Sequence, residues 1–115
     1  MRSPLLYLSE MLSAARTIND FTTGMDKNAF MRDEKTKSAV VRQLEIIGEA
    51  AKAIPAEIRY LAPDINWRNI AAMRDRIIHA YFDVDYNLIW DTVIEDVPLL
   101  ERTLERLINE LNSNN

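Results

Sequence analysis

One histidine and three arginines lie close together in the second half of the chain. Arg68, Arg74 and Arg76 fall within nine residues, and His79, the one histidine of the sequence, follows them. Histidine is the side chain best suited to transfer protons near neutral pH, and clustered arginines can form a local basic pocket. A histidine at a helix end can instead be structural and bind the terminal carbonyl groups. The sequence leaves both interpretations open.

The spacing of these residues limits which of them can meet on a regular helix. Arg74 and His79 are five positions apart, which places them about 140° apart around an ideal α-helix. Arg74 instead shares a face with Tyr81, whereas Arg76 shares a face with His79. Helix geometry therefore favours Arg76 as the partner of His79. Arg74 and His79 could contact one ligand at a distorted helix end, through long side chains, or across a dimer interface.

Other candidate residues carry weaker signals. Glu45 and Glu49 are four positions apart and could act as paired carboxylates for a metal ion. With one histidine and no cysteine, an exposed face or a salt bridge to an arginine is the commoner explanation. The rings of Trp67 and Trp90 are expected to anchor the core or an interface rather than to stack on bases. We therefore predict no metal site and no cofactor.

The first half of the chain has two helix patterns. Ser3 followed by Pro4 is typical of an N-cap and the first helical position, and Gly24 suits the residue that follows a helix. Residues 25–36 are expected to form a connection and the first turns of the second helix. Gly48 lies inside that helix, where the close approach of a neighbouring helix would explain a glycine. The second helix is indicated by apolar residues at three- and four-residue steps, namely Val40, Leu44, Ile47, Ala51 and Ile54.

The second half predicts the helix that carries the arginines, and a long final helix. Residues 56–62 could form a short helix, and Asn66 suits the N-cap of the third main helix, whose end carries His79. Asp85 suits the N-cap of the last helix, in which Pro98 should cause a kink. The third helix has one apolar stripe of Ile70, Met73, Ile77 and Ala80. The last helix has a longer one of Tyr86, Trp90, Val93, Val97, Leu100, Leu104, Leu107 and Leu111.

These patterns predict an all-α protein, an up-and-down helical bundle of four main helices plus a short helix. We expect a single domain over residues 1–115, with a frayed tail at 112–115. The chain has a formal net charge of −4, which argues against broad electrostatic binding to nucleic acid but not against a local basic pocket. No apolar run is long enough to span a membrane, and Glu10 and Arg16 interrupt any signal-peptide core. A cytoplasmic location is therefore expected.

The segment around His79 resembles a known family. Arg74-Asp75-Arg76-Ile77-Ile78-His79-Ala80-Tyr81 is similar to the arginine-x4-histidine-x-tyrosine signature of HepT-like proteins in the HEPN superfamily. Similar flanking segments lie at residues 41–50, 66–70 and 81–86, so that the resemblance spans about residues 5–110. It implies an HEPN-like fold and a toxin of a toxin–antitoxin pair.

The resemblance also implies an activity and partners. Such proteins are helical homodimers that cut RNA without a metal, and their partner is a minimal nucleotidyltransferase antitoxin that transfers AMP to the tyrosine of the motif. By this resemblance Arg74 and His79 are the catalytic pair of a metal-independent endoribonuclease, Tyr81 is the AMPylated residue, and Asp75 has at most a supporting role. Arg76 remains a second supporting candidate. A 2′,3′-cyclic phosphate is the expected product.

Two other functions stay open on the sequence. One is a non-catalytic nucleotide-binding or adaptor subunit that regulates a nucleotidyltransferase, which the acidic net charge favours. The other is a helical dimerisation module, which the long apolar stripe of the last helix would serve.

Overall fold

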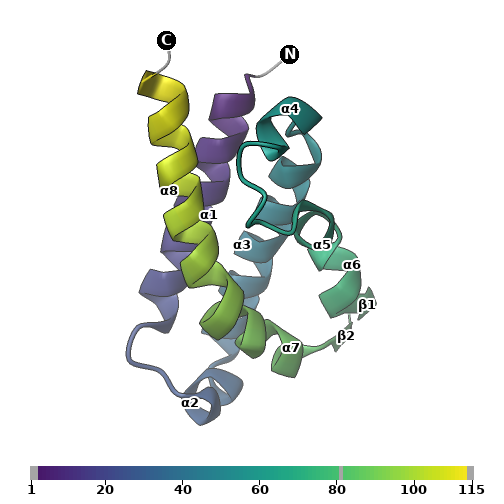
Figure 1. The fold of residues 1–115 in the computed structure, drawn as a ribbon. Helices are drawn as coiled ribbons and strands as arrows, with labels where there is room; N and C mark the ends of the chain where they lie inside the picture. Colours follow the sequence, from purple (N-terminus) through teal and green to yellow (C-terminus); the bar gives the residue numbers. More distant parts are fainter. Residues whose placement is uncertain (1–2, 81, 114–115) are drawn as a thin grey trace.

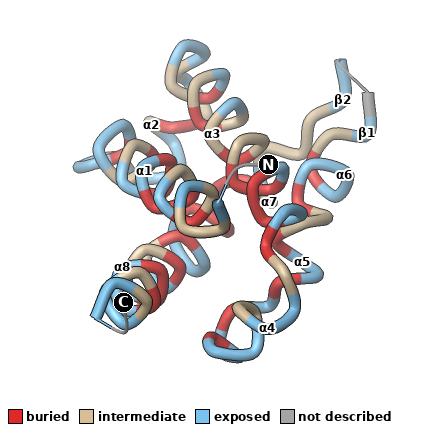
Figure 2. Tube along the Cα trace, turned by 90° about the horizontal axis from the view of Figure 1, so that it is seen from above, coloured by how far each residue is buried: buried red, intermediate tan, exposed pale blue. Residues whose placement is uncertain are grey.

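Three long helices form the frame of the molecule. The computed structural model describes residues 3–80 and 82–113. Helices α1 (Pro4–Thr22), α3 (Glu34–Lys52) and α8 (Val97–Ser113) run side by side, with α1 in contact with both others (Figure 1). Their buried residues face the middle of the bundle, as the view from above shows (Figure 2). The expected all-α bundle is confirmed.

The first connection contains a helix of its own. The Ser3 hydroxyl accepts a hydrogen bond from the Leu6 N–H, and Gly24 follows α1 with a φ of 78°, so both predicted ends of this helix are confirmed. The expectation for residues 25–36 was incomplete, because helix α2 (Lys27–Arg32) lies between two aspartate caps. One of these caps, Asp33, accepts hydrogen bonds from the backbone and hydroxyl of Thr36, which hold the pKa of its carboxyl below the usual range.

Helix α3 contacts the backbone of α5 at Gly48. The N-cap of α5 (Trp67–Ala71) at Asn66 is as predicted, and the short helix α4 (Ala56–Arg59) covers the first part of the predicted segment 56–62. A Cβ atom at Gly48 would lie 3.3 Å from the carbonyl oxygen of Ile70. This confirms the close approach expected at the glycine, and it fixes α5 against the middle of α3.

The third main helix is broken, contrary to the sequence prediction. It consists of α5, a turn at Ala72 and α6 (Met73–Ile77), after which the chain becomes extended as β1 (Ile78–Ala80). This strand pairs antiparallel with β2 (Asp83–Val84), with Ile78 opposite Val84. The Ile77 carbonyl accepts a hydrogen bond of 2.8 Å from the Asp85 N–H rather than one from a further helical turn. His79 therefore lies on a strand and not at a helix end.

The last helix is long and contains one wide turn. Asp85 caps α7 (Tyr86–Asp91) as predicted, and the π-helical segment η1 (Thr92–Asp96) joins α7 to α8. The Val97 N–H donates to the carbonyl of Thr92, five residues earlier, immediately before Pro98. Helix α8 continues to Ser113, so two residues of the expected frayed tail are helical and the last two lie outside the described residues.

The core joins all of these segments. Both tryptophans are buried, as expected of core anchors: the ring of Trp90 lies 5.1 Å from that of Phe30, and the Trp67 Nε1 donates to the Ala62 carbonyl. Among residues 3–80 and 82–113, no helix is both long and apolar enough to cross a membrane. The fully buried large side chains are Phe30, Leu8, Met11, Ile18, Leu44, Ile47, Ile77, Ile89, Leu104, Leu107, Val40 and Val97.

Replacing Gly48 should separate α3 from α5. We expect Gly48→Val to lower the free energy of unfolding by about 1–3 kcal/mol, because the new methyl groups meet the backbone of Ile70. Urea denaturation measures the loss. Glu49→Val, at the neighbouring exposed position of the same helix, is the control and should cost less. Equal losses in the two variants would show that the contact at Gly48 is unimportant.

Candidate functional site

The break in the third helix brings Arg74 and His79 to one cleft. The cleft has a volume of about 390 Å³ and lies between α3, α6, the β-hairpin and the start of α7. Arg74 reaches it from α6 and His79 from β1. The complete lining is Ser38, Val41, Glu45, Arg74, Ile78, His79, Val84 and Tyr86.

Arg76 faces a different cavity, which corrects the partner that helix geometry favoured. On a continuous helix His79 would share a face with Arg76. Because the helix ends at Ile77 and the chain continues as a strand, His79 instead lines the cleft of Arg74. Arg76 lines a cavity bordered by η1 and α8. A distorted helix end was one of the three ways in which Arg74 and His79 could contact one ligand, and the helix does end between these two residues.

Two carboxylates hold the guanidinium of Arg74. Its Nε lies 3.5 Å from Oε2 of Glu45, and its Nη1 lies 3.5 Å from Oδ1 of Asp75. The side chain of Glu45 is 28% exposed, against 76% for Asp75, so the first pair is the better shielded from solvent. The expectation that Glu45 pairs with an arginine is confirmed, while Glu49 pairs with Lys52 at 3.2 Å. Asp75 contacts Arg74, as a supporting residue would.

The imidazole of His79 is exposed at the mouth of the cleft. It lies in β1, so it does not have the helix-terminal position that a structural role would have given it. Within residues 3–80 and 82–113, no side chain or backbone group forms a hydrogen bond with this imidazole. The described residues therefore leave both ring nitrogens open to a ligand of the cleft.

Tyr81, the expected site of modification, lies outside the described residues. By sequence it directly follows β1, two positions after His79. In the part of the chain that the structure describes, no group of three histidine, cysteine, aspartate or glutamate residues is arranged to hold a metal ion.

Sequence reasoning missed two polar residues of the cleft. Ser38 lies on α3 three and seven positions before Val41 and Glu45, and these three residues share one face of the helix. That spacing could have placed Ser38 on the same face as Glu45, two turns earlier. Tyr86 was assigned to the apolar stripe of the last helix, yet its ring is only partly buried, with the Nζ of Lys37 4.5 Å from its centroid.

The known proteins with similar sequences that follow are all described as ribonucleases. The family model described as ribonuclease HepT-like matches residues 11–107. The chain is 47% identical over 106 residues to a probable ribonuclease HepT of Thermococcus cleftensis, covering 92% of this chain and 96% of that protein. It is 39% identical over 105 residues to a putative RNase of Methanocaldococcus jannaschii, covering 91% and 87%. A putative RNase of Caldanaerobacter subterraneus is 36% identical over 110 residues, with 96% and 98% covered. No solved structure matches the chain.

The ion pair of Arg74 with Glu45 can be measured by a double-mutant cycle. We expect Glu45→Gln and Arg74→Gln to show a coupling free energy of about 0.2–1 kcal/mol, since the pair is only partly shielded. The coupling should fall in 1 M NaCl because salt screens it. Glu49→Gln combined with Arg74→Gln is the matched control and should show none. A salt-independent coupling at Glu45 would contradict an ionic contact.

Proposed function

Because the chain belongs to the ribonuclease HepT-like family of HEPN proteins, we propose that it is a ribonuclease that cuts RNA in the cleft of Arg74 and His79. The observation that carries this proposal is that both residues line the same cleft within one chain. One of them is a proton-transfer group and the other a permanent cation, the two functions that cleavage of a phosphodiester next to a 2′-hydroxyl requires.

The proposed reaction is an internal transfer within the RNA. The 2′-oxygen attacks the adjacent phosphorus as its proton passes to a base, and the bond from phosphorus to the 5′-oxygen breaks as that oxygen takes up a proton. The products are a 2′,3′-cyclic phosphate and a 5′-hydroxyl. His79 acts as the base or as the acid. Arg74 stabilises the charge on the phosphorane oxygens, for which its planar guanidinium offers two parallel donors.

The pairing of Arg74 with Glu45 supports this assignment. A guanidinium that is held at the edge of the cleft loses less side-chain freedom when a phosphate binds. The same pairing supports a metal-independent reaction, because Glu45 and Glu49 are each engaged by a cation of the protein. We propose that Arg74 supplies the positive charge that a metal ion supplies in other nucleases.

We also propose that the protein acts as a homodimer in the cytoplasm. A second chain is not needed to bring Arg74 and His79 to one cleft, because both line it within one chain. The remaining support is exposed apolar surface: Phe82 is 79% exposed on the hairpin that carries His79, and Ile94 is 55% exposed on η1. A second chain would supply a second histidine, so that base and acid need not be the same residue.

The regulation that we propose acts through Tyr81. A minimal nucleotidyltransferase antitoxin would transfer AMP from ATP to its hydroxyl, with release of pyrophosphate. Bulk and negative charge two positions from His79 would then exclude RNA and occupy nearby arginines. The protein would thus be the toxin of a toxin–antitoxin pair. An adaptor subunit that binds nucleotide without cleaving RNA is the second candidate, favoured by the net charge of −4.

Loss of either cleft residue should stop RNA cleavage. We expect His79→Ala to lower kcat by about 10²–10⁴-fold while the free energy of unfolding changes by less than about 1 kcal/mol. Arg74→Lys should lower kcat by at least about tenfold because lysine lacks the bidentate fork. Arg74→Ala should lower kcat more than Arg76→Ala does, because Arg76 faces the other cavity. Initial rates on a fluorescent RNA give these values.

The same assay contains its controls. Arg102→Ala removes an exposed arginine from α8 and should leave the rate unchanged. Cleavage should persist in EDTA and leave a 2′,3′-cyclic phosphate. Loss of cleavage in EDTA with recovery in Mg²⁺ would contradict the mechanism, and wild-type protein that binds nucleotide but never cleaves RNA would favour the adaptor.

Tyr81 should be the regulatory residue and not a catalytic one. We expect Tyr81→Phe to keep RNase activity, because no proton transfer requires the hydroxyl, and to resist silencing by the cognate nucleotidyltransferase with ATP. The wild type should gain one or more AMP units, located by mass spectrometry of peptides. AMP found on another residue, or complete silencing of Tyr81→Phe, would overturn the assignment.

A further inference from the structure

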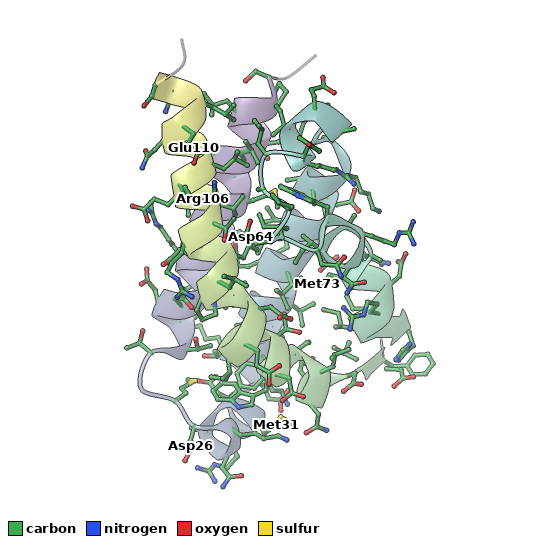
Figure 3. The ribbon with its side chains drawn as sticks, viewed as in Figure 1. Asp26, Met31, Asp64, Met73, Arg106 and Glu110 are labelled. Carbon is green, nitrogen blue, oxygen red and sulfur yellow. The ribbon has the colours of Figure 1, made fainter. Side chains whose placement is uncertain are left out.

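A second cavity lies on the side of α6 away from His79. Its volume is about 220 Å³, and it is bordered by α5, α6, η1 and the start of α8. The floor is apolar and buried, with Ile70, Met73 and Leu100 each 3–8% exposed. Figure 3 labels Met73 in the space between α6 and the long C-terminal helix. The cavity is smaller than sites for drug-sized ligands, so it suits a single ring system.

The rim of this cavity carries three polar side chains that the fold does not use. Asn69, Arg76 and Asp96 are exposed, and none of them makes a side-chain hydrogen bond or ion pair with another described residue. Asp64, on the same rim, differs, because its carboxylate accepts hydrogen bonds from Thr103 and Arg106 of α8, each at 3.3 Å. Figure 3 labels Asp64 and Arg106 of this group. The three unused side chains offer a carboxylate acceptor, an amide that both donates and accepts, and a cationic donor.

A separate feature of the backbone also marks this place. The π-helical segment η1 ends at Asp96 and supplies Thr92 and Asp96 to the cavity. Such wide turns are rare and often occur at functional sites. On the following turn Leu99 is 43% exposed at the rim, and this apolar surface is available to the face of a ring.

We propose that this cavity binds one nucleobase of the RNA strand, next to the nucleotide that is cut. This inference rests on the proposed ribonuclease function. The base lies on Met73, Leu99 and Leu100, and its edge meets Asn69 and Asp96. Cytosine, adenine and guanine each offer an exocyclic amino group to the carboxylate of Asp96, whereas the one N–H of the uracil ring lies between two carbonyl oxygens that repel a carboxylate. The cavity therefore favours the three amino-bearing bases over uracil.

The two arginines of α6 fit a strand that crosses this helix. Arg74 meets the scissile phosphate on one side, and Arg76 meets a neighbouring phosphate on the other. A strand that crosses α6 has to span the diameter of this one five-residue helix, about 10–12 Å with its side chains. Arg76 and Asp96 bring opposite charges to the same rim, where Arg106 pairs with Asp64.

The proposal is tested with DNA oligonucleotides that contain one ribonucleotide, which fixes the position of the cut. The base at that nucleotide and at its neighbours on both sides is varied, and kcat/KM is measured for each. We expect the wild type to prefer amino-bearing bases over uracil by about tenfold or more at one position. Asn69→Ala and Asp96→Asn should reduce this ratio to less than about twofold. Asn109→Ala, an exposed asparagine on α8, should keep it.

A binding experiment separates this proposal from the proposed activity. The same sequences made entirely of DNA are bound to the His79→Ala variant and followed by fluorescence anisotropy. A base preference in binding that Asn69→Ala removes supports the cavity even if no cleavage is found. Cleavage without base preference at any position overturns the cavity and leaves the ribonuclease intact. A base preference that survives both Asn69→Ala and Asp96→Asn also overturns the base-binding cavity. The absence of any base preference in both cleavage and binding overturns it as well.

Discussion

The site depends on the close approach of α3 to the backbone of α5 at Gly48. A Cβ atom there would lie 3.3 Å from the Ile70 carbonyl oxygen, which is tighter than most such contacts, so the missing side chain lets the two helices approach this closely. The contact fixes α5, and therefore α6, against the middle of α3. Glu45 lies one turn before Gly48, and for this reason it can reach the guanidinium of Arg74. Packing in the core thus determines which charged groups meet at the surface.

The break between α6 and β1 gives the cleft its composition. A continued helix would direct His79 to the side of Arg76, away from Arg74. The hydrogen bond from Asp85 to the Ile77 carbonyl, together with the pairing of Ile78 and Val84, instead ends the helix before His79. The two arginines of α6 then face two different cavities. The end of the helix at Ile77 therefore reverses the pairing of arginine and histidine that the spacing on a continuous helix predicts.

The parts of the fold that the sequence predicts are those that follow from local rules. The caps at Ser3, Asn66 and Asp85 were predicted because each depends on residues within one turn. The close approach at Gly48 was predicted from a glycine inside a helix, although its partner Ile70 is far along the chain. The break in the third helix was not predicted, because the stripe of Ile70, Met73 and Ile77 fits a buried face whether the helix is broken or continuous. Strand β1 forms because it pairs with β2, which lies after the turn of the hairpin. The β-branched and aromatic residues of segment 77–84 were the available signal. For the cleft, the sequence supplied the residue types, but the choice between the two arginines needed the backbone.

The acidic net charge is compatible with an RNA substrate if affinity does not depend on long-range attraction. Charges more than about 8 Å apart are largely screened at physiological ionic strength. The net charge of −4 therefore affects RNA binding less than the groups that touch the RNA strand do. In the proposed site only Arg74 and Arg76 meet phosphates, so few counterions are released and affinity depends weakly on salt. Binding energy must then come from burial of a base on the apolar floor beside α6. Such a protein selects its substrate at the cavity rather than by general attraction to nucleic acid. This limits the binding of RNA that lacks a suitable base at the cavity.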